Sequence, residues 1–120
     1  GGELSRLMLC IKSLVARKLQ LPTLIFDEID AGVSGDVSMK MGLILKELAG
    51  RHQVICITHT PQVAARADAH YFVYKKIQGD RTLTNVRLLN EDERVRSIAV
   101  MMSGNPPSDA ALVTAKELIG

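Results

Sequence analysis

Residues 23–30 read TLIFDEID, a short apolar run that ends in two adjacent carboxylates. A continuous apolar run over so few positions is typical of a strand that is buried on both faces. Residues 53–60 read QVICITHT and repeat this order, with β-branched residues followed at once by polar ones. Two such strands with a helical segment between them predict an α/β fold, in which a mainly parallel sheet is flanked by helices.

Helical spacing marks the segments around these two strands. A second helix is predicted over residues 37–49, ended by Gly50, and one or two helical turns are predicted over residues 62–67. An amphipathic helix is predicted over residues 3–19, from the apolar positions Leu4, Leu7, Met8, Ile11, Leu14 and Val15.

The character of the sequence changes after residue 69. In residues 70–89, apolar and polar residues alternate more than they form continuous apolar runs, and QGDR supplies a turn. Together these features predict an antiparallel hairpin. Asn90 and Glu93 have the spacing of a capping box, which predicts the start of a helix that ends near residue 102. A short helix over residues 110–119 closes the chain.

Composition narrows the class of protein without identifying it. The chain has 120 residues, 47% of them hydrophobic, and a net charge of +2, which suits one domain and gives little reason to expect nucleic-acid binding by this segment alone. No apolar run approaches the roughly 18 residues that a membrane-spanning helix needs. Cys10 and Cys56 lie far apart within apolar segments, so we predict two buried thiols in a reducing, cytoplasmic compartment.

Polar side chains follow both predicted strands. Asp27 and Glu28 end the first strand, and His59 follows the second. Ligands of open α/β sheets bind outside the carboxyl ends of the strands, so we expect these three side chains to meet at one edge. The alternative is that Asp27 caps the following loop, Glu28 is solvated and His59 is an ordinary surface histidine.

The first residues of the chain form a second candidate site. Gly1 and Gly2 allow close backbone approach, and the helix that starts with Glu3 offers free N–H groups to an anion. The alternative is a flexible terminus.

Taken together, the motifs GGELSR, TLIFDEID and ITHTPQ resemble the ATP-binding-cassette ATPase head, a P-loop NTPase. This resemblance implies ATP and Mg²⁺ as cofactors. It makes Asp27 the Mg²⁺ ligand, Glu28 the catalytic carboxylate that handles the attacking water, and His59 the switch histidine. The first three residues then form part of a signature motif that binds ATP in trans, on a partner subunit: Gly1, Gly2 and Glu3.

The motifs DEIDAGVSG, THTPQVAARAD and HYFVYK narrow the resemblance to the RecN family of bacterial SMC-like DNA repair proteins, over nearly the whole chain. Related heads carry Leu-Asp in the D-loop where this chain has Val33 and Ser34, which puts a role carried over from that Asp in doubt. We interpret the loop as a D-loop that crosses to the partner subunit, or as a glycine-rich connection that caps the next helix. Its candidate residues are Asp30, Gly32, Ser34 and Gly35.

No phosphate loop of the form G-x-x-x-x-G-K-[ST] is present, so residues 1–120 resemble the C-terminal half of a split head. The implied partners are the N-terminal Walker A half of the same protein, a second copy through head engagement, and DNA in the full-length protein. We expect an ATPase in the full-length dimer, located in the bacterial cytoplasm at the nucleoid, and an inactive segment on its own. The alternatives are a chromosome-organising SMC-type ATPase head and a non-catalytic interaction domain of the same fold.

Overall fold

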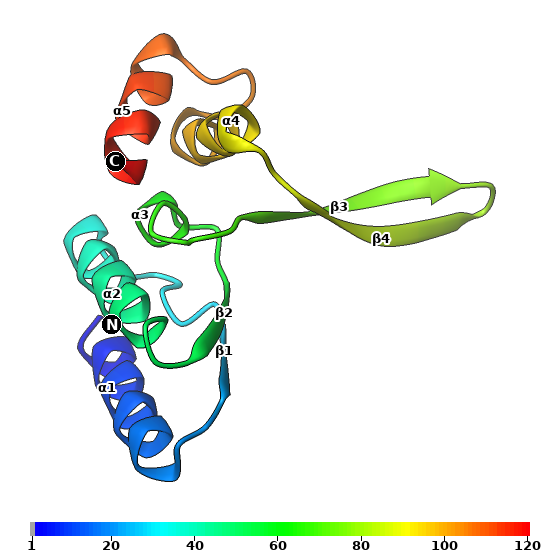
Figure 1. Cartoon of the computed structure of the whole chain (residues 1–120). Helices are drawn as coiled ribbons and strands as arrows, with labels where there is room; N and C mark the ends of the chain where they lie inside the picture. The colour runs from blue at the N-terminus through cyan, green and yellow to red at the C-terminus, as the bar shows by residue number, and fades with distance from the viewer. Residues whose placement is uncertain (1) are drawn as a thin grey trace.

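The computed structural model describes residues 2–120, which form five helices and four strands over that range (Figure 1). The predicted elements are all present, within a few residues of their expected bounds. In chain order they are α1 (Gly2–Leu19), β1 (Thr23–Asp27), α2 (Gly35–Leu48), β2 (Gln53–Ile57), α3 (Pro61–Ala64), β3 (Tyr71–Gln78), β4 (Arg81–Leu88), α4 (Glu91–Ser103) and α5 (Asp109–Ile119).

The two apolar runs form a parallel pair of strands, as predicted. β1 pairs with β2 in a register that sets Thr23 opposite Gln53 and Asp27 opposite Ile57. The crossover between them is α2, whose first turn is capped by Ser34, because the side chain of Ser34 accepts a hydrogen bond from the backbone of Val37. Both strands therefore end at the same edge, where the polar residues begin.

The prediction that both strands are buried on both faces is wrong within residues 2–120. Leu24 and Phe26 are buried, whereas the alternate residue Ile25 is 63% exposed. Ile55 and Ile57 of β2 are also exposed. The physical reason is visible in Figure 1, where α1 and α2 lie on the same side of the strands and leave the opposite side open.

The core on the covered side is built mainly from α1, α2 and the inner residues of β1, and Val54 and Cys56 of β2 pack against it partly buried. It consists of Leu9, Ala16, Leu24, Phe26, Met41, Leu45, Leu48 and Val63. On α2, Met41, Leu45 and Leu48 are buried against this core. On α1, the predicted apolar stripe does not face the core: Leu4, Leu7 and Leu14 are 64, 55 and 64% exposed, and the buried residues of this helix are Leu9 and Ala16.

The cysteine prediction is also corrected at α1. Cys10 is exposed, because it lies beside Leu9 and outside the narrow strip of α1 that contacts the core. Cys56 is partly buried on β2.

A second core joins α3, α4 and α5. It is made of small residues and one isoleucine: Ala64, Ala65, Ile98, Ala99, Ala111 and Ala115. The predicted capping box is present, with Asn90 and Glu93 bonded reciprocally at the start of α4. The buried Arg94 of α4 donates hydrogen bonds to the backbone carbonyls of Ala65 at 2.9 Å and Ala67 at 2.6 Å, which ties α4 to the end of α3.

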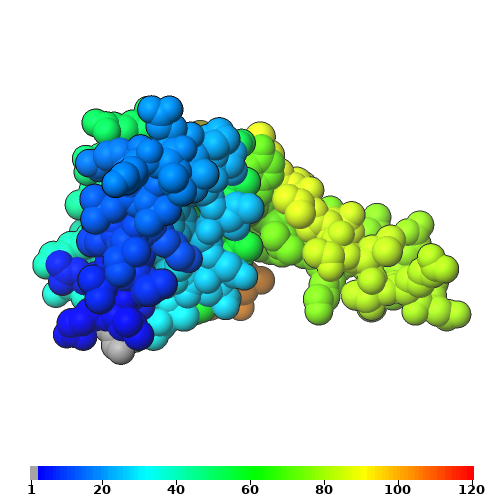
Figure 2. Space-filling model, turned by 90° about the horizontal axis from the view of Figure 1, so that it is seen from below, coloured from blue at the N-terminus to red at the C-terminus, as the bar shows by residue number. Residues whose placement is uncertain are grey.

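The hairpin β3–β4 extends away from both cores (Figure 1), and Figure 2 shows it protruding beyond the body of the molecule. Its register pairs Tyr71 with Leu88 and Gln78 with Arg81, around a turn in which Gly79 has a φ of +63°. Nearly every residue of both strands is exposed. Within residues 2–120, no helix combines the length and the apolarity that crossing a membrane requires.

Candidate functional site

The two carboxylates lie at the carboxyl end of β1, and both are exposed. Asp27 is the last residue of the strand, and Glu28 follows it with a φ of +51°, in the left-handed region that non-glycine residues rarely occupy. The backbone N–H of Glu28 donates to the carbonyl of Ile57 at 2.8 Å. The turn at Glu28 is therefore anchored to the end of β2.

His59 comes to the same edge from β2, as the sequence predicts. Its Nδ1 atom lies 3.7 Å from Oε1 of Glu28, and the two side chains are 73 and 57% exposed. This distance is too long for a hydrogen bond and suits a solvated ion pair when the imidazole is protonated. Their exposure also fits the alternative, in which Glu28 is solvated and His59 is an ordinary surface histidine, so the catalytic roles of Glu28 and His59 stay predictions.

The loop after Glu28 is less open than the sequence suggests. Asp30 is only 2% exposed, and its Oδ2 atom accepts a hydrogen bond from the hydroxyl of Thr58. Ser34 caps α2, and Gly32 has a φ of +74° with open space around its α-carbon. The side chains of Asp30 and Ser34 are thus engaged within the chain, which favours the helix-capping interpretation for Ser34. The roles of Gly32 and Gly35 in contacting a partner subunit stay predictions.

The signature residues are only partly described. Gly1 lies outside residues 2–120, Gly2 is the first residue of α1, and Glu3 is an exposed acidic residue in the first turn of that helix. Figure 1 shows α1 and β1 running in opposite directions, so the start of α1 lies at the same end of this unit as the carboxyl end of β1. Their action on a partner's nucleotide stays a prediction.

The carboxylate at this edge suits a Mg²⁺ ion, which needs few protein ligands, better than a metal ion that is held entirely by protein side chains. Within residues 2–120, no group of three or more His, Cys, Asp or Glu side chains is placed to hold a metal ion. Mg²⁺ commonly takes one or two carboxylates and completes its shell with waters and substrate phosphates. Asp27, an exposed carboxylate at this edge, is the residue that would hold the ion.

Thr58 is the residue of this site that our sequence reasoning missed. Its hydroxyl donates to Asp30 and accepts from the backbone N–H of Thr60 at 3.0 Å, so it spans the turn that carries His59 and joins this turn to the loop after Glu28. The available signal was a threonine at the end of an apolar strand directly before a candidate histidine. Two residues earlier on β2, burial and the charge of Asp30 raise the pKa of the Cys56 thiol to about 11.

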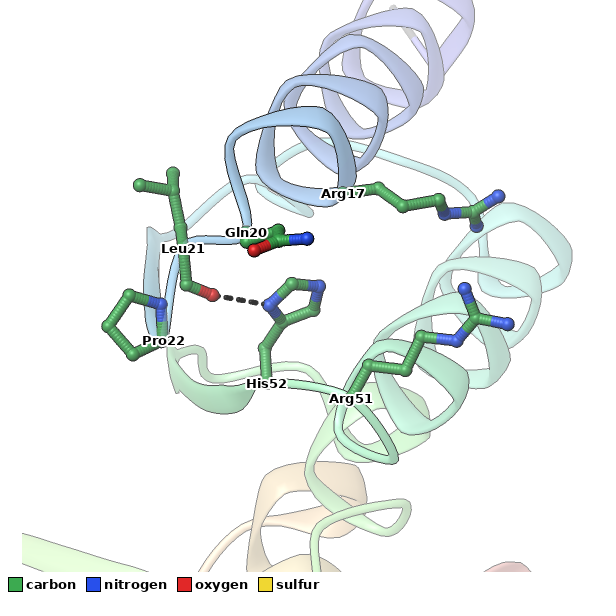
Figure 3. Close-up of a pocket in the computed structure, with 6 residues that line it drawn as sticks. All are labelled: Arg17, Gln20, Leu21, Pro22, Arg51 and His52. Atoms are coloured by element: carbon green, nitrogen blue, oxygen red, sulfur yellow. Dashed lines mark hydrogen bonds between the residues drawn. The ribbon is translucent and has the colours of Figure 1, made fainter.

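A pocket of about 280 Å³ lies at the opposite edge of the strands and takes no part in this site. Pro22 directly precedes β1 and His52 directly precedes β2, so the pocket sits where the strands start. Figure 3 shows His52 reaching toward the chain before β1, with its Nδ1 atom 2.5 Å from the carbonyl oxygen of Leu21. The pocket is lined by Arg17, Gln20, Leu21, Pro22, Arg51 and His52.

The chain is similar in sequence to DNA repair protein RecN. It is 45% identical to RecN of Deinococcus radiodurans, 47% to that of Rickettsia prowazekii and 43% to that of Bacillus subtilis, in each case over 99% of its length. The chain spans about a fifth of the length of these relatives, 21 or 22%. No protein-family model matches it.

Two solved structures show the same fold. A chain from work on ATP-driven dimerization and DNA-stimulated activation of SMC ATPases superposes with a TM-score of 0.69, at 20% identity, over 86% of this chain and 62% of that one. The SMC head domain of Pyrococcus yayanosii gives 0.68, at 22% identity, over 86% of this chain and 19% of that one. The predicted resemblance to the C-terminal part of RecN and the predicted ATPase-head fold are therefore both confirmed.

Proposed function

We propose that this chain, which matches the C-terminal part of RecN, forms the Walker B and switch-histidine half of an ATP-hydrolysing head in a DNA repair protein. The observation that carries the proposal is the convergence of Asp27, Glu28 and His59 at one exposed edge. Two adjacent parallel strands deliver these residues, and Glu28 and His59 face each other across 3.7 Å.

Each residue has a distinct task in this proposal. Asp27 holds Mg²⁺, largely through water, and the bound ion neutralises charge on the phosphates. Glu28 orients or deprotonates the water that attacks the γ-phosphate, and His59 contacts that phosphate. Rigid placement matters because phosphoryl transfer depends mostly on positioning and charge stabilisation.

The left-handed backbone of Glu28 agrees with this function, and Gln20 in the turn after α1 has the same conformation, with a φ of +52°. A non-glycine residue at positive φ costs of order 1 kcal/mol or more, and such residues cluster at functional sites. Here the left-handed turn at Glu28 (φ +51°) leaves the side chain exposed beside His59.

Activity in this proposal needs further parts. The phosphate loop comes from the N-terminal Walker A half, because no such motif occurs in these 120 residues. Gly1, Gly2 and Glu3 act in trans when two heads engage, and DNA is the partner of the assembled protein in the cytoplasm. One structural neighbour is described as undergoing ATP-driven dimerization, which supports head engagement.

The test is MgATP hydrolysis by the full-length protein with Glu28→Gln. We expect turnover to fall at least about 100-fold while ATP binding survives, because a catalytic base contributes on this scale and Gln keeps the size of the side chain. Glu117→Gln makes the same change at an exposed position of α5 and serves as the matched control. Unchanged turnover in Glu28→Gln would show that Glu28 is not the catalytic carboxylate and would overturn the proposal.

A further inference from the structure

Asp30 is a buried carboxylate in the loop that follows the exposed Glu28. Two residues after Glu28, it is 2% exposed. Burying a carboxylate is unfavourable unless the charge is hydrogen-bonded or paired. Its Oδ2 atom accepts the hydroxyl proton of Thr58, and its Oδ1 atom has no hydrogen-bond partner among the described residues. Thr58 thus supplies the one hydrogen bond that this buried carboxylate receives from the described residues.

The hydrogen bonds of Thr58 fix the direction of its hydroxyl. The oxygen accepts the backbone N–H of Thr60 at 3.0 Å, so its one proton is available to Asp30. His59 is the residue between Thr58 and Thr60. The same hydroxyl therefore closes the backbone turn that carries His59 and joins that turn to the loop after Glu28.

A second link runs parallel to the first. The backbone N–H of Glu28 donates to the carbonyl of Ile57 at 2.8 Å, and the N–H of Ala31 donates to the carbonyl of Glu28 at 3.2 Å. Residues 28–31 and 57–60 are consequently joined by one backbone bond and one side-chain bond. Glu28 and His59 project from these two joined segments.

We infer that Asp30 and Thr58 form a positioning pair that fixes His59 relative to Glu28. This inference rests on the proposed function and adds residues to it that touch neither ATP nor the attacking water. Removing the hydroxyl frees the turn that carries His59 and leaves the buried carboxylate without its donor. Since displacements of about 1 Å can cost about 100-fold in rate, the effect falls on the chemical step rather than on nucleotide affinity.

The test uses the full-length protein with Thr58→Val and Thr58→Ser. Valine has a similar shape and no hydroxyl, whereas serine keeps the hydroxyl. We expect Thr58→Val to lower kcat about tenfold or more with the KM for ATP changed less than about threefold, and Thr58→Ser to restore kcat to within about threefold. A second readout is amide hydrogen exchange over residues 58–62, which we expect to accelerate in Thr58→Val and to stay slow in Thr58→Ser.

A further variant covers the case in which Thr58→Val does not fold. Replacing both partners with apolar residues, Asp30→Leu with Thr58→Val, removes the unsatisfied charge together with the link. We expect this double variant to fold and to show the same loss of kcat. An unchanged kcat in a folded variant would overturn the inference. Glu28→Gln, measured in parallel, separates the two proposals, because full turnover in that variant would overturn the proposed function itself.

Discussion

Glu28 combines an unfavourable backbone with an exposed side chain to which we assign a catalytic role. Its φ of +51° places a β-carbon where L-residues meet steric conflict, and only glycine escapes that conflict fully. The residue is bonded through its backbone to Ile57, so the turn cannot relax without losing the hydrogen bond to β2. If Glu28 acts as proposed, stability and activity make opposite demands at this position.

This conflict gives a prediction for the pair Glu28→Gly and Glu28→Ala. Both variants lose the carboxylate, but only glycine relieves the backbone, so we expect Glu28→Gly to have the higher free energy of unfolding by about 1 kcal/mol. Denaturant unfolding of the two variants measures the difference. Alanine is the matched control, because it keeps the β-carbon. Equal stabilities would mean that the turn carries no strain.

The two cysteines differ enough in environment to predict their reactivity. Cys10 is exposed, whereas the pKa of Cys56 is raised to about 11 by burial and by the charge of Asp30. A raised pKa means less thiolate at a given pH, so at pH 8 only about one in a thousand Cys56 side chains is ionised. We expect iodoacetamide at pH 8 to label Cys10 and spare Cys56, as measured by peptide mass spectrometry.

The control for this labelling is the unfolded protein, in which both cysteines should react at similar rates. In the folded protein the rate at Cys56 should rise with pH up to about 11, because the thiolate is the reactive form. Rapid labelling of Cys56 at pH 8 would contradict the burial of β2 on its inner face.

At the residue scale, the sequence predicted the exposed part of the site and missed the buried part. The meeting of Glu28 and His59 follows from strand order, since parallel strands end at one edge. The hydrogen bond between Asp30 and Thr58 could not be predicted in this way, because an aspartate in a glycine-rich loop is usually exposed to solvent. Its burial depends on how the loop packs against β2, which is a tertiary property.

The contact between helices α2 and α3 leaves no room for a larger side chain at Gly42. A β-carbon at Gly42 would lie 3.0 Å from the backbone oxygen of Gln62 and 3.1 Å from Cγ of Arg66. Backbone atoms move only at a cost, so this glycine allows the close approach of the two helices. α3 follows His59 after a single residue, which means that the contact also supports the turn of the candidate site.

We therefore predict that Gly42→Ala destabilises the protein. Alanine improves helix propensity by about 1 kcal/mol, but overpacking against a backbone typically costs about 1–3 kcal/mol, so the free energy of unfolding should fall by up to about 2 kcal/mol. Gly35→Ala in the same helix is the matched control, because its β-carbon would meet only the flexible end of Gln62, at 3.4 Å. A Gly42→Ala protein as stable as Gly35→Ala would show that α3 can shift freely.

The sequence predicted the elements well and their buried faces less well. Local signals mark the ends of elements, such as the capping box at Asn90 and the turn at Gly79, and these signals act within a few residues. Which face of an element is covered depends on its neighbours. The stripe of α1 that includes Leu4 and Leu14 has helical spacing, yet α1 contacts the core through Leu9 and Ala16 instead.

The whole molecule is more open than a compact domain of its length. Its radius of gyration is 15.5 Å, against about 13.6 Å expected for 120 compact residues. Two separate cores and a protruding hairpin explain the difference (Figure 1). Large hydrophobic side chains are exposed on the open face of β1 and β2. They are also exposed along the apolar stripe of α1.

This exposure predicts self-association of the 120-residue chain. Single exposed apolar residues are ordinary, but contiguous ones mark surfaces that bind another chain, and unpaired strand edges add to the tendency. We expect the mass measured by light scattering to rise above 13.1 kDa as concentration increases. Leu7→Lys with Leu14→Lys should lower it toward the monomer, because both side chains are exposed on α1 and lysine adds charge to the stripe.

The matched control adds the same charge to another helix, through Ala110→Lys with Thr114→Lys at exposed positions of α5. If general repulsion caused the effect, this control would lower the mass equally. In the split head that we propose, the Walker A half covers part of this apolar surface, so adding that half should suppress self-association of the unaltered chain. A chain that stays monomeric at every concentration would show that its exposed apolar residues do not form an interface.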